Sequence, residues 1–113
     1  MCIRDSYKIC PTHADAIHEY CFGTIWDRPN LDLKTREMIV MAAAAALDLP
    51  HEVGLHVRGA MNRGAKKEEL IEVILQCSPY IGFPKTNHAL KACLLYTSPS
   101  PRDLSTSRMP SSA

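Results

Sequence analysis

The apolar run "MIVMAAAAA", residues 38–46, constrains the fold of this chain more than any other stretch. It continues a helical pattern that starts at Leu33, and Asp32 stands where a side-chain N-cap is needed. A helix that is apolar on every side should be buried, and small alanines allow a second helix to approach closely. The run is too short to span a bilayer, which needs about 20 apolar residues. We therefore expect a helix from Leu33 to about Leu47 at the centre of a packed helical domain.

The stretch before this helix also has helical spacing. Residues 12–26 carry Ile17, Tyr20 and Cys21 three to four positions apart, and Thr12 is available as an N-cap. Pro29 and its neighbours then interrupt the pattern, which predicts a loop before Asp32.

Three more helices are expected after the helix that runs from Leu33 to about Leu47. One runs from about His51 to Arg63 and ends at Gly64, a common residue just past a helix terminus. The next begins near residue 66 and ends at Gly82 and Pro84, and the last, residues 85–92, opens with Asn87 and His88, for which we expect capping and solvent exposure. No strand-like alternation occurs, so the predicted fold class is all-α, a single helical domain of about five helices. The expected core stripe of the fourth helix is Leu70, Val73, Ile74, Cys77 and Ile81.

The two ends of the chain have an unusual relation to each other. Back-translated, residues 1–6 give a DNA word whose opposite strand, in a shifted frame, encodes Cys-Leu-Leu-Tyr-Thr, the sequence of residues 93–97. Such complementarity is typical of translated sequencing adapter rather than of a protein motif. We predict that residues 1–6 and 93–113 are adapter-derived, the latter as a disordered tail, and that residues 7–92 form a domain truncated at both ends.

Composition excludes several classes of function. The formal net charge is +1 and no basic stripe is present, which argues against nucleic acid. No apolar segment is long enough for a membrane span. Outside the two ends the cysteines are Cys10, Cys21 and Cys77, an odd number without a CxxC pair. That pattern favours a reduced, cytoplasmic protein over a disulfide scaffold.

Glu52 and His56 are the first candidates for chemistry. They lie four residues apart on the third predicted helix, so their side chains are neighbours on its surface. A carboxylate beside an imidazole can fix its tautomer or stabilise the imidazolium, which suits proton transfer. The same spacing also occurs as an exposed surface pair without function.

Four motifs in order resemble the carboxymuconolactone decarboxylase family of the alkylhydroperoxidase-like superfamily. They are "GTIWDRPNLDLKTRE" (23–37), "HVRGAMNRG" (56–64), "EELIEVILQ" (68–76) and "YIGFPKTN" (80–87). The resemblance implies an all-α, homo-oligomeric protein (a trimer or hexamer) with sites near subunit contacts. It also implies activity on a small molecule, with no nucleic-acid or membrane partner.

One departure separates two branches of that superfamily. The peroxidase-type members carry a CxxC pair followed by a histidine, and aligning that histidine with His56 puts the cysteines at Leu49 and Glu52. A thiol peroxidase needs a thiolate and usually a second, resolving thiol. The resemblance therefore favours the decarboxylase branch, and the same alignment places an upstream acidic residue on Glu37.

The implied reaction is cofactor-independent decarboxylation of 4-carboxymuconolactone to the β-ketoadipate enol-lactone, in aromatic-acid catabolism through the β-ketoadipate route. It requires no metal. We expect His56 to deliver a proton, with Glu37 or Glu52 orienting or recharging it. The substrate carboxylates call for guanidinium groups, which bind them in bidentate fashion. The expected substrate-binding residues are Arg36, Arg58 and Trp26, with Arg28 and Arg63 as weaker candidates. For Trp26, an anchoring role in the core is favoured over that of a pocket wall.

Other functions remain open at this point. A relative acting on another lactone, ketoacid or quinone-like compound would carry the same motifs. A thiol-type alkylhydroperoxidase or peroxiredoxin activity would need a reactive Cys21 or Cys77, although Cys77 lies on a predicted core stripe. A non-catalytic helical oligomerisation module is the third alternative.

Overall fold

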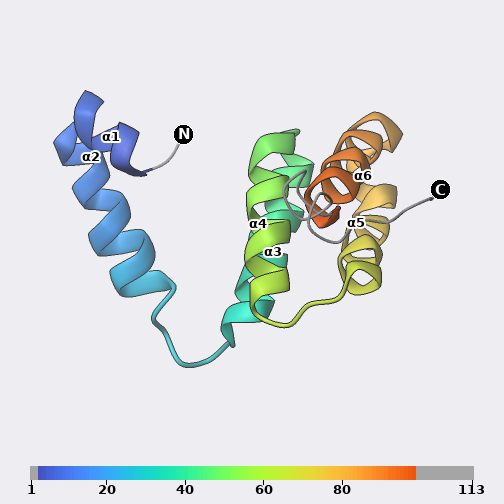
Figure 1. Ribbon diagram of the computed structural model, residues 1–113, viewed down its shortest axis with the longest axis horizontal. Coiled ribbons are helices and arrows are strands. Elements are labelled where there is room, and N and C mark those ends of the chain that lie inside the picture. Colours follow the sequence, from blue (N-terminus) through green and yellow to red (C-terminus); the bar gives the residue numbers. More distant parts are fainter. Residues whose placement is uncertain (1–2, 99–113) are drawn as a thin grey trace, which may run out of the picture.

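The computed structural model describes residues 3–98, and every regular element in that range is helical, which confirms the all-α fold class. Figure 1 shows two parts, an N-terminal arm and a helical bundle, joined by a loop. The arm consists of α1 (Ile3–Ile9), α2 (Pro11–Ala16) and η1 (Ile17–Ile25). The bundle consists of α3 (Leu33–Ala46), α4 (Pro50–Asn62), α5 (Lys67–Ile81) and α6 (Phe83–Thr97).

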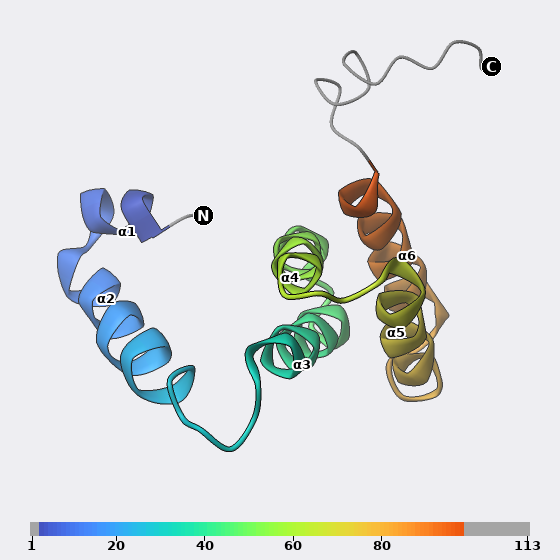
Figure 2. The same cartoon turned by 60° about the horizontal axis from the view of Figure 1, so that its bottom comes forward.

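The bundle has a continuous apolar core. Helix α3 packs on α4, α4 on α6, and α5 on both α6 and α3 (Figure 2). Leu70 and Ile74 are fully buried, as the predicted stripe of α5 requires, whereas Val73, Cys77 and Ile81 are only half-buried. The largest side chains that are fully buried are Met41, Leu70, Ile74, Val53, Val57 and Cys93.

Helix α3 is less buried than its composition predicts. Asp32 caps it as expected, because its carboxylate accepts a 2.7 Å hydrogen bond from the backbone N–H of Thr35. Ala44 and Ala45 are buried against neighbouring helices, but Ile39 is 51% exposed. The expectation of burial on every side is therefore wrong, because the other bundle helices cover only part of α3.

The arm differs from its prediction in two ways. Cys10 occupies the N-cap position of α2 without a side-chain capping hydrogen bond, and Pro11 begins the helix, so Thr12 is not the N-cap. Residues 17–25 are π-helical, and the backbone N–H of Trp26 donates to the carbonyl of Cys21, five residues earlier, at 2.9 Å. No residue of η1 is buried, and Tyr20 on its predicted stripe is 65% exposed.

Two glycines end helices where the sequence places them. Gly64 follows α4 with φ 99°, and Gly82 follows α5 with φ 92°. Both values lie in the left-handed region, which glycine enters without the steric penalty of a Cβ. No helix within residues 3–98 is both long enough and apolar enough to cross a membrane.

Helix α6 extends beyond the predicted boundary of the domain. It continues through Thr97, and Cys93 is buried in the bundle core at 1% exposure. Residues 93–97 are therefore helical and not part of a disordered tail, because their apolar side has a surface of α4 and α5 to pack on. Asn87 and His88 lie within α6 rather than at its start. The adapter origin of both ends stays a prediction, and residues 99–113 lie outside the described part of the chain.

Candidate active site

The centre of the site is a carboxylate–imidazole pair across two bundle helices. Glu37 of α3 and His56 of α4 approach to 2.7 Å between Oε1 and Nδ1. Their side chains are 11% and 22% exposed, respectively. An ionised carboxylate only accepts hydrogen bonds, so Nδ1–H of His56 donates to Glu37. The other ring nitrogen, Nε2, is then the one left for a reacting group.

The close helix packing at Gly59 explains how Glu37 can be buried there. A Cβ built on Gly59 would lie 2.5 Å from Oε2 of Glu37 and 2.6 Å from its carboxyl carbon. Gly59 is one turn after His56 on α4, so the missing side chain leaves room for the carboxylate directly beside the imidazole. No side chain larger than hydrogen fits at this position without moving the carboxylate.

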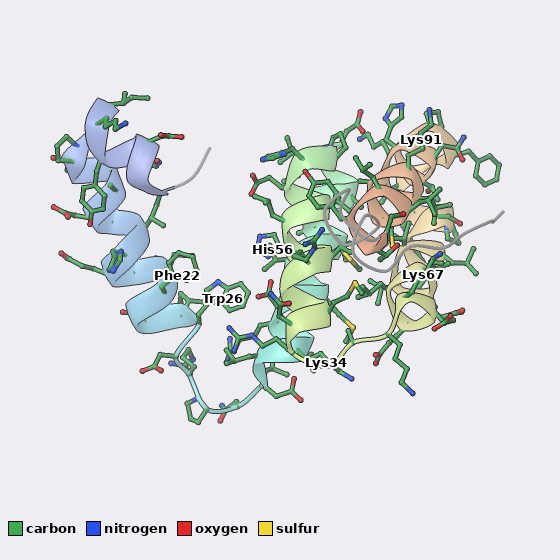
Figure 3. The ribbon with its side chains drawn as sticks, viewed as in Figure 1. Phe22, Trp26, Lys34, His56, Lys67 and Lys91 are labelled. Carbon is green, nitrogen blue, oxygen red and sulfur yellow. The ribbon has the colours of Figure 1, made fainter. Side chains whose placement is uncertain are left out.

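Trp26 forms a wall of the site. Its ring stacks on that of His56 with centroids 6.1 Å apart and planes 19° apart, and Phe22 lies against Trp26 at 6.1 Å. Figure 3 shows both aromatic side chains extending from the arm toward the bundle and His56. Trp26 is not part of the bundle core, so the core role favoured from the sequence is wrong and the pocket-wall role is the one the geometry supports.

Two cavities meet at this wall. Both are lined by Phe22, Trp26, Leu55 and His56. The first, here called the polar cavity, has a volume of about 390 Å³, and the second, here called the apolar cavity, about 460 Å³. The polar cavity adds Asp27, Leu33, Glu37 and Arg63, and the apolar cavity adds Ser6, Ile17, Cys21, Val40 and Glu52.

Glu52 lies in the site but not on the imidazole. It lines the apolar cavity and is half-buried, yet within residues 3–98 it makes neither a hydrogen bond nor an ion pair. His56 is paired with Glu37 instead, across the helix interface. Of the two predicted orienting carboxylates, the geometry therefore gives that position to Glu37.

The arginine that lines a cavity beside His56 is not one of the two that the sequence analysis favoured. Arg36 is engaged by the loop before α3, because its Nη2 donates to the carbonyl of Arg28 at 2.7 Å and its Nε to that of Leu31 at 3.3 Å. Arg58 is exposed and lines neither cavity beside His56. Arg63 does line the polar cavity, and in the described range its guanidinium has no hydrogen-bond or ion-pair partner. The residue ranked weaker from sequence is thus the cation at the site.

Residues that sequence reasoning missed are Phe22, Leu55 and Gly59. Phe22 precedes Trp26 by four positions, a spacing at which side chains on one helix meet, so an aromatic pair was readable there. Gly59 carried no such signal, because its role depends on which residue of α3 faces it. No cluster of three or more metal-binding side chains occurs among the described residues.

Comparison with known proteins identifies a family and several relatives that are similar in sequence. The sequence profile of the "Carboxymuconolactone decarboxylase family" matches residues 11–94. The chain is 39% identical over 74 residues to a 4-carboxymuconolactone decarboxylase of Acinetobacter baylyi, covering 66% of this chain and 55% of that protein. It is 36% identical over 88 residues to nitrosuccinic acid decarboxylase npaB of Metarhizium robertsii, covering 78% and 62%. It therefore spans less than two thirds of the length of either decarboxylase.

Proposed function

Since the chain belongs to the carboxymuconolactone decarboxylase family, we propose that it is a carboxy-lyase acting on a small lactone carboxylate of the 4-carboxymuconolactone type. The product would be the β-ketoadipate enol-lactone, in the catabolism of aromatic acids. The observation that carries the proposal is the buried Glu37–His56 pair, whose imidazole borders two cavities of small-molecule size. Two relatives named as decarboxylases of different acids support the reaction type.

The chemistry needs one proton donor at a fixed position. When the bond between the ring carbon and the carboxylate breaks, carbon dioxide leaves and the electron pair passes into the conjugated lactone system. A proton must then be added to carbon, and we assign this step to Nε2 of His56, the ring nitrogen that Glu37 does not engage. Glu37 holds the ring by its Nδ1–H, so that Nε2 keeps one direction, and solvent restores the proton afterwards.

Substrate binding rests on Arg63 in this proposal. A lactone with two carboxylates requires a cation, and guanidinium groups bind carboxylates through two parallel hydrogen bonds. Arg63 lines the polar cavity and has no hydrogen-bond or ion-pair partner within residues 3–98, whereas the Arg36 guanidinium already donates to two backbone carbonyls. Trp26 and Phe22 would cover the flat face of the lactone.

The proposed working form is a cytoplasmic homo-oligomer, a trimer or a hexamer. Large apolar side chains remain exposed on the arm and on the outer side of α3, and a second copy of the chain would cover them. Four of these side chains are Tyr20 (65% exposed), Phe22 (49%), Ile25 (36%) and Ile39 (51%). The odd number of cysteines outside the two ends and the lack of a CxxC pair support the cytoplasmic location. Light scattering of the purified chain tests the assembly.

The experiment follows 4-carboxymuconolactone consumption and carbon dioxide release, with nitrosuccinic acid as a second substrate. His56→Ala and Glu37→Gln should lower turnover by about 100-fold or more, since general acid catalysis contributes that much. His88→Ala is the matched control, because Nδ1 of His88 also pairs with a carboxylate, Asp48, at 2.8 Å, outside both cavities. Loss of turnover in the control to the same extent would contradict the role of His56.

A thiol peroxidase is the second candidate, because Cys21 lines the apolar cavity together with His56. The same preparations are therefore given an alkyl hydroperoxide. Peroxide consumption that disappears in Cys21→Ser would replace the decarboxylase proposal. A folded oligomer without either activity would favour the non-catalytic oligomerisation module.

A further inference from the structure

Three ionisable side chains follow one another along one side of α4 and its C-cap residue Arg63, which comes directly after Asn62 at the end of the helix. Glu52, His56 and Arg63 are separated by four and then seven residues. At 3.6 residues per turn, His56 lies about 40° around the helix axis from Glu52, and Arg63 lies about 20° from His56 in the opposite sense. The three side chains therefore share one stripe, with the imidazole between an anionic end and a cationic end.

We infer that this stripe binds a small dianion in one direction, so that the carboxylate retained in the product lies at Arg63 and the carboxylate that is lost lies beside Glu52. The inference rests on the proposed decarboxylase function and specifies its substrate class and the role of Glu52. The other wall of the site is the aromatic pair Phe22–Trp26, which has no charge and cannot set a direction. Direction must come from α4.

The two ends of the stripe lie on opposite sides of His56 along the helix axis. With a rise of 1.5 Å per residue, Glu52 is about 6 Å and Arg63 about 10 Å from His56 along the helix axis. Long side chains of a helix lean toward its N-terminus, which brings the Arg63 guanidinium back toward His56 and moves the Glu52 carboxylate away from it. Both ends line cavities that His56 also lines, so one ligand can contact the imidazole and either end.

The charges around the two ends differ in sign. In the lining of the apolar cavity, Glu52 is the one side chain of fixed charge, beside His56 and Cys21. At the other end Asp27 lines the polar cavity with Arg63, and both border an adjoining surface cavity with Arg28. Glu37 is already engaged by His56. Arg63 is thus the cation in the lining of the polar cavity, beside the carboxylate of Asp27, whereas the lining of the apolar cavity contains no cation of fixed charge.

This asymmetry favours one bond for cleavage. A carboxylate in the apolar cavity would be repelled by Glu52, and the repulsion disappears when its C–C bond breaks and it leaves as neutral carbon dioxide. The electron pair of that bond stays on the substrate, and His56 supplies the proton that makes the new C–H bond. The carboxylate on Arg63 keeps its charge throughout, so its binding energy holds the substrate in place.

The kinetic consequences separate this role of Glu52 from a proton relay. Glu52→Gln removes the repulsion, so KM should fall together with kcat, each on the order of 10-fold. Arg63→Gln should raise KM by about 10- to 100-fold, since a hydrogen-bonded carboxylate loses its charged partner. If Glu52 only recharged His56, Glu52→Gln would lower kcat, leave KM unchanged and alter the pH profile of kcat. Glu68→Gln, an exposed carboxylate at the start of α5, is the matched control.

Binding of adipate, a dianion without the lactone that the reaction requires, is measured in parallel by calorimetry. We expect Glu52→Gln to bind adipate more tightly than the wild-type chain, and Arg63→Gln more weakly. An unchanged or weaker affinity in Glu52→Gln, or an unchanged KM, would overturn the inference. The affinities for adipate could rank as expected, with Glu52→Gln tightest and Arg63→Gln weakest, while the wild-type chain releases no carbon dioxide from the lactone. That result would contradict the proposed reaction and leave the directed dianion site standing.

Discussion

The bundle and the arm use the same kind of sequence pattern with opposite results. In the bundle, the stripes of α4 and α5 become a closed core in which Val57 and Leu70 are fully buried. In the arm, the apolar residues of η1 follow a similar spacing, yet none of them is buried. The difference is that each bundle helix has a partner to pack on, whereas η1 packs chiefly on α2.

This contrast assigns different tasks to the two parts. The bundle holds the Glu37–His56 pair rigidly, because both residues come from helices packed against each other. The arm contributes Phe22 and Trp26, which cover the pair from outside. The pair proposed to transfer the proton therefore lies in the closely packed bundle, and the proposed aromatic wall lies in the less buried arm. Such a division is common in enzymes whose ligand-covering segments come from regions of low local stability.

The variant with the largest expected effect on stability is in the core of the bundle and leaves the arm unchanged. Leu70→Ala should lower the free energy of unfolding by about 2–5 kcal/mol, because it removes a fully buried side chain and leaves a cavity. Phe22→Ala, at a half-exposed position of the arm, should change it by less than about 0.5 kcal/mol while raising KM. Urea unfolding followed by circular dichroism measures both. Equal losses of stability in the two variants would show that the arm packs on the bundle more tightly than this structure indicates.

The sequence predicted the bundle better than the arm for a physical reason. Asp32, Gly64 and Gly82 act locally, through a cap or a backbone angle, so their roles follow from the residue and its neighbours. The π-helical turn of η1 carries no such signal, because the periodicity of its side chains resembles that of an α-helix. The sequence also could not predict that one side of α3 is partly exposed, since the burial of each side depends on which other helices pack on α3.

For the site, the sequence provided the residues but not all of their partners. His56 and Glu37 were both predicted, the latter through the family resemblance, yet spacing along one helix favoured Glu52 as the neighbour of His56. The contact to Glu37 joins two helices, and pairs of that kind cannot be derived from a local pattern. The ranking of the arginines failed for the same reason, because the Arg36 guanidinium is engaged by loop carbonyls.

One methyl group added at the interface between α3 and α4 should have the next largest effect, which is on turnover. Gly59→Ala places a Cβ within 2.5–2.7 Å of the carboxylate of Glu37, which must move away from His56. We expect turnover to fall by about 100-fold, the cost of a misplacement of roughly 1 Å. Stability should change less, since alanine favours the helix by about 1 kcal/mol and overpacking costs about 1–3 kcal/mol.

The double variant Gly59→Ala/Glu37→Ala is the control for this prediction. Without the carboxylate there is nothing for the new methyl group to displace, so the addition of Gly59→Ala to Glu37→Ala should leave the stability unchanged or raise it. Steady-state kinetics and urea unfolding are measured on the wild-type chain, the two single variants and the double variant, which together form a double-mutant cycle. Full activity in Gly59→Ala would mean that the carboxylate has room elsewhere and that the close packing does not position it.

The smallest effect concerns how the bundle keeps α3 and α5 together at its surface. The ammonium of Lys34 lies 3.1 Å from a carboxylate oxygen of Glu69, and this hydrogen bond, with a further one from the backbone N–H of Lys66, holds the pKa of Glu69 below its ordinary value of 4.5. A lowered pKa means that the stabilisation is present above the ordinary pKa and is lost as the pH falls through the folded-state pKa.

Lys34→Met should therefore be slightly less stable than the wild-type chain at pH 7 and equally stable once Glu69 is protonated in both, because only the ionised carboxylate gains from the ammonium group. Urea unfolding between pH 7 and pH 2 measures the difference, which we expect to shrink as the pH falls below 4.5, the ordinary pKa of the Glu69 carboxyl. Lys91→Met, at an exposed position of α6 without an ion pair in the described range, should show no such trend. A difference that stays constant down to pH 2 would assign the effect to the apolar stem of Lys34 and not to its charge, and the contact between α3 and α5 would then be a packing contact like those of the core.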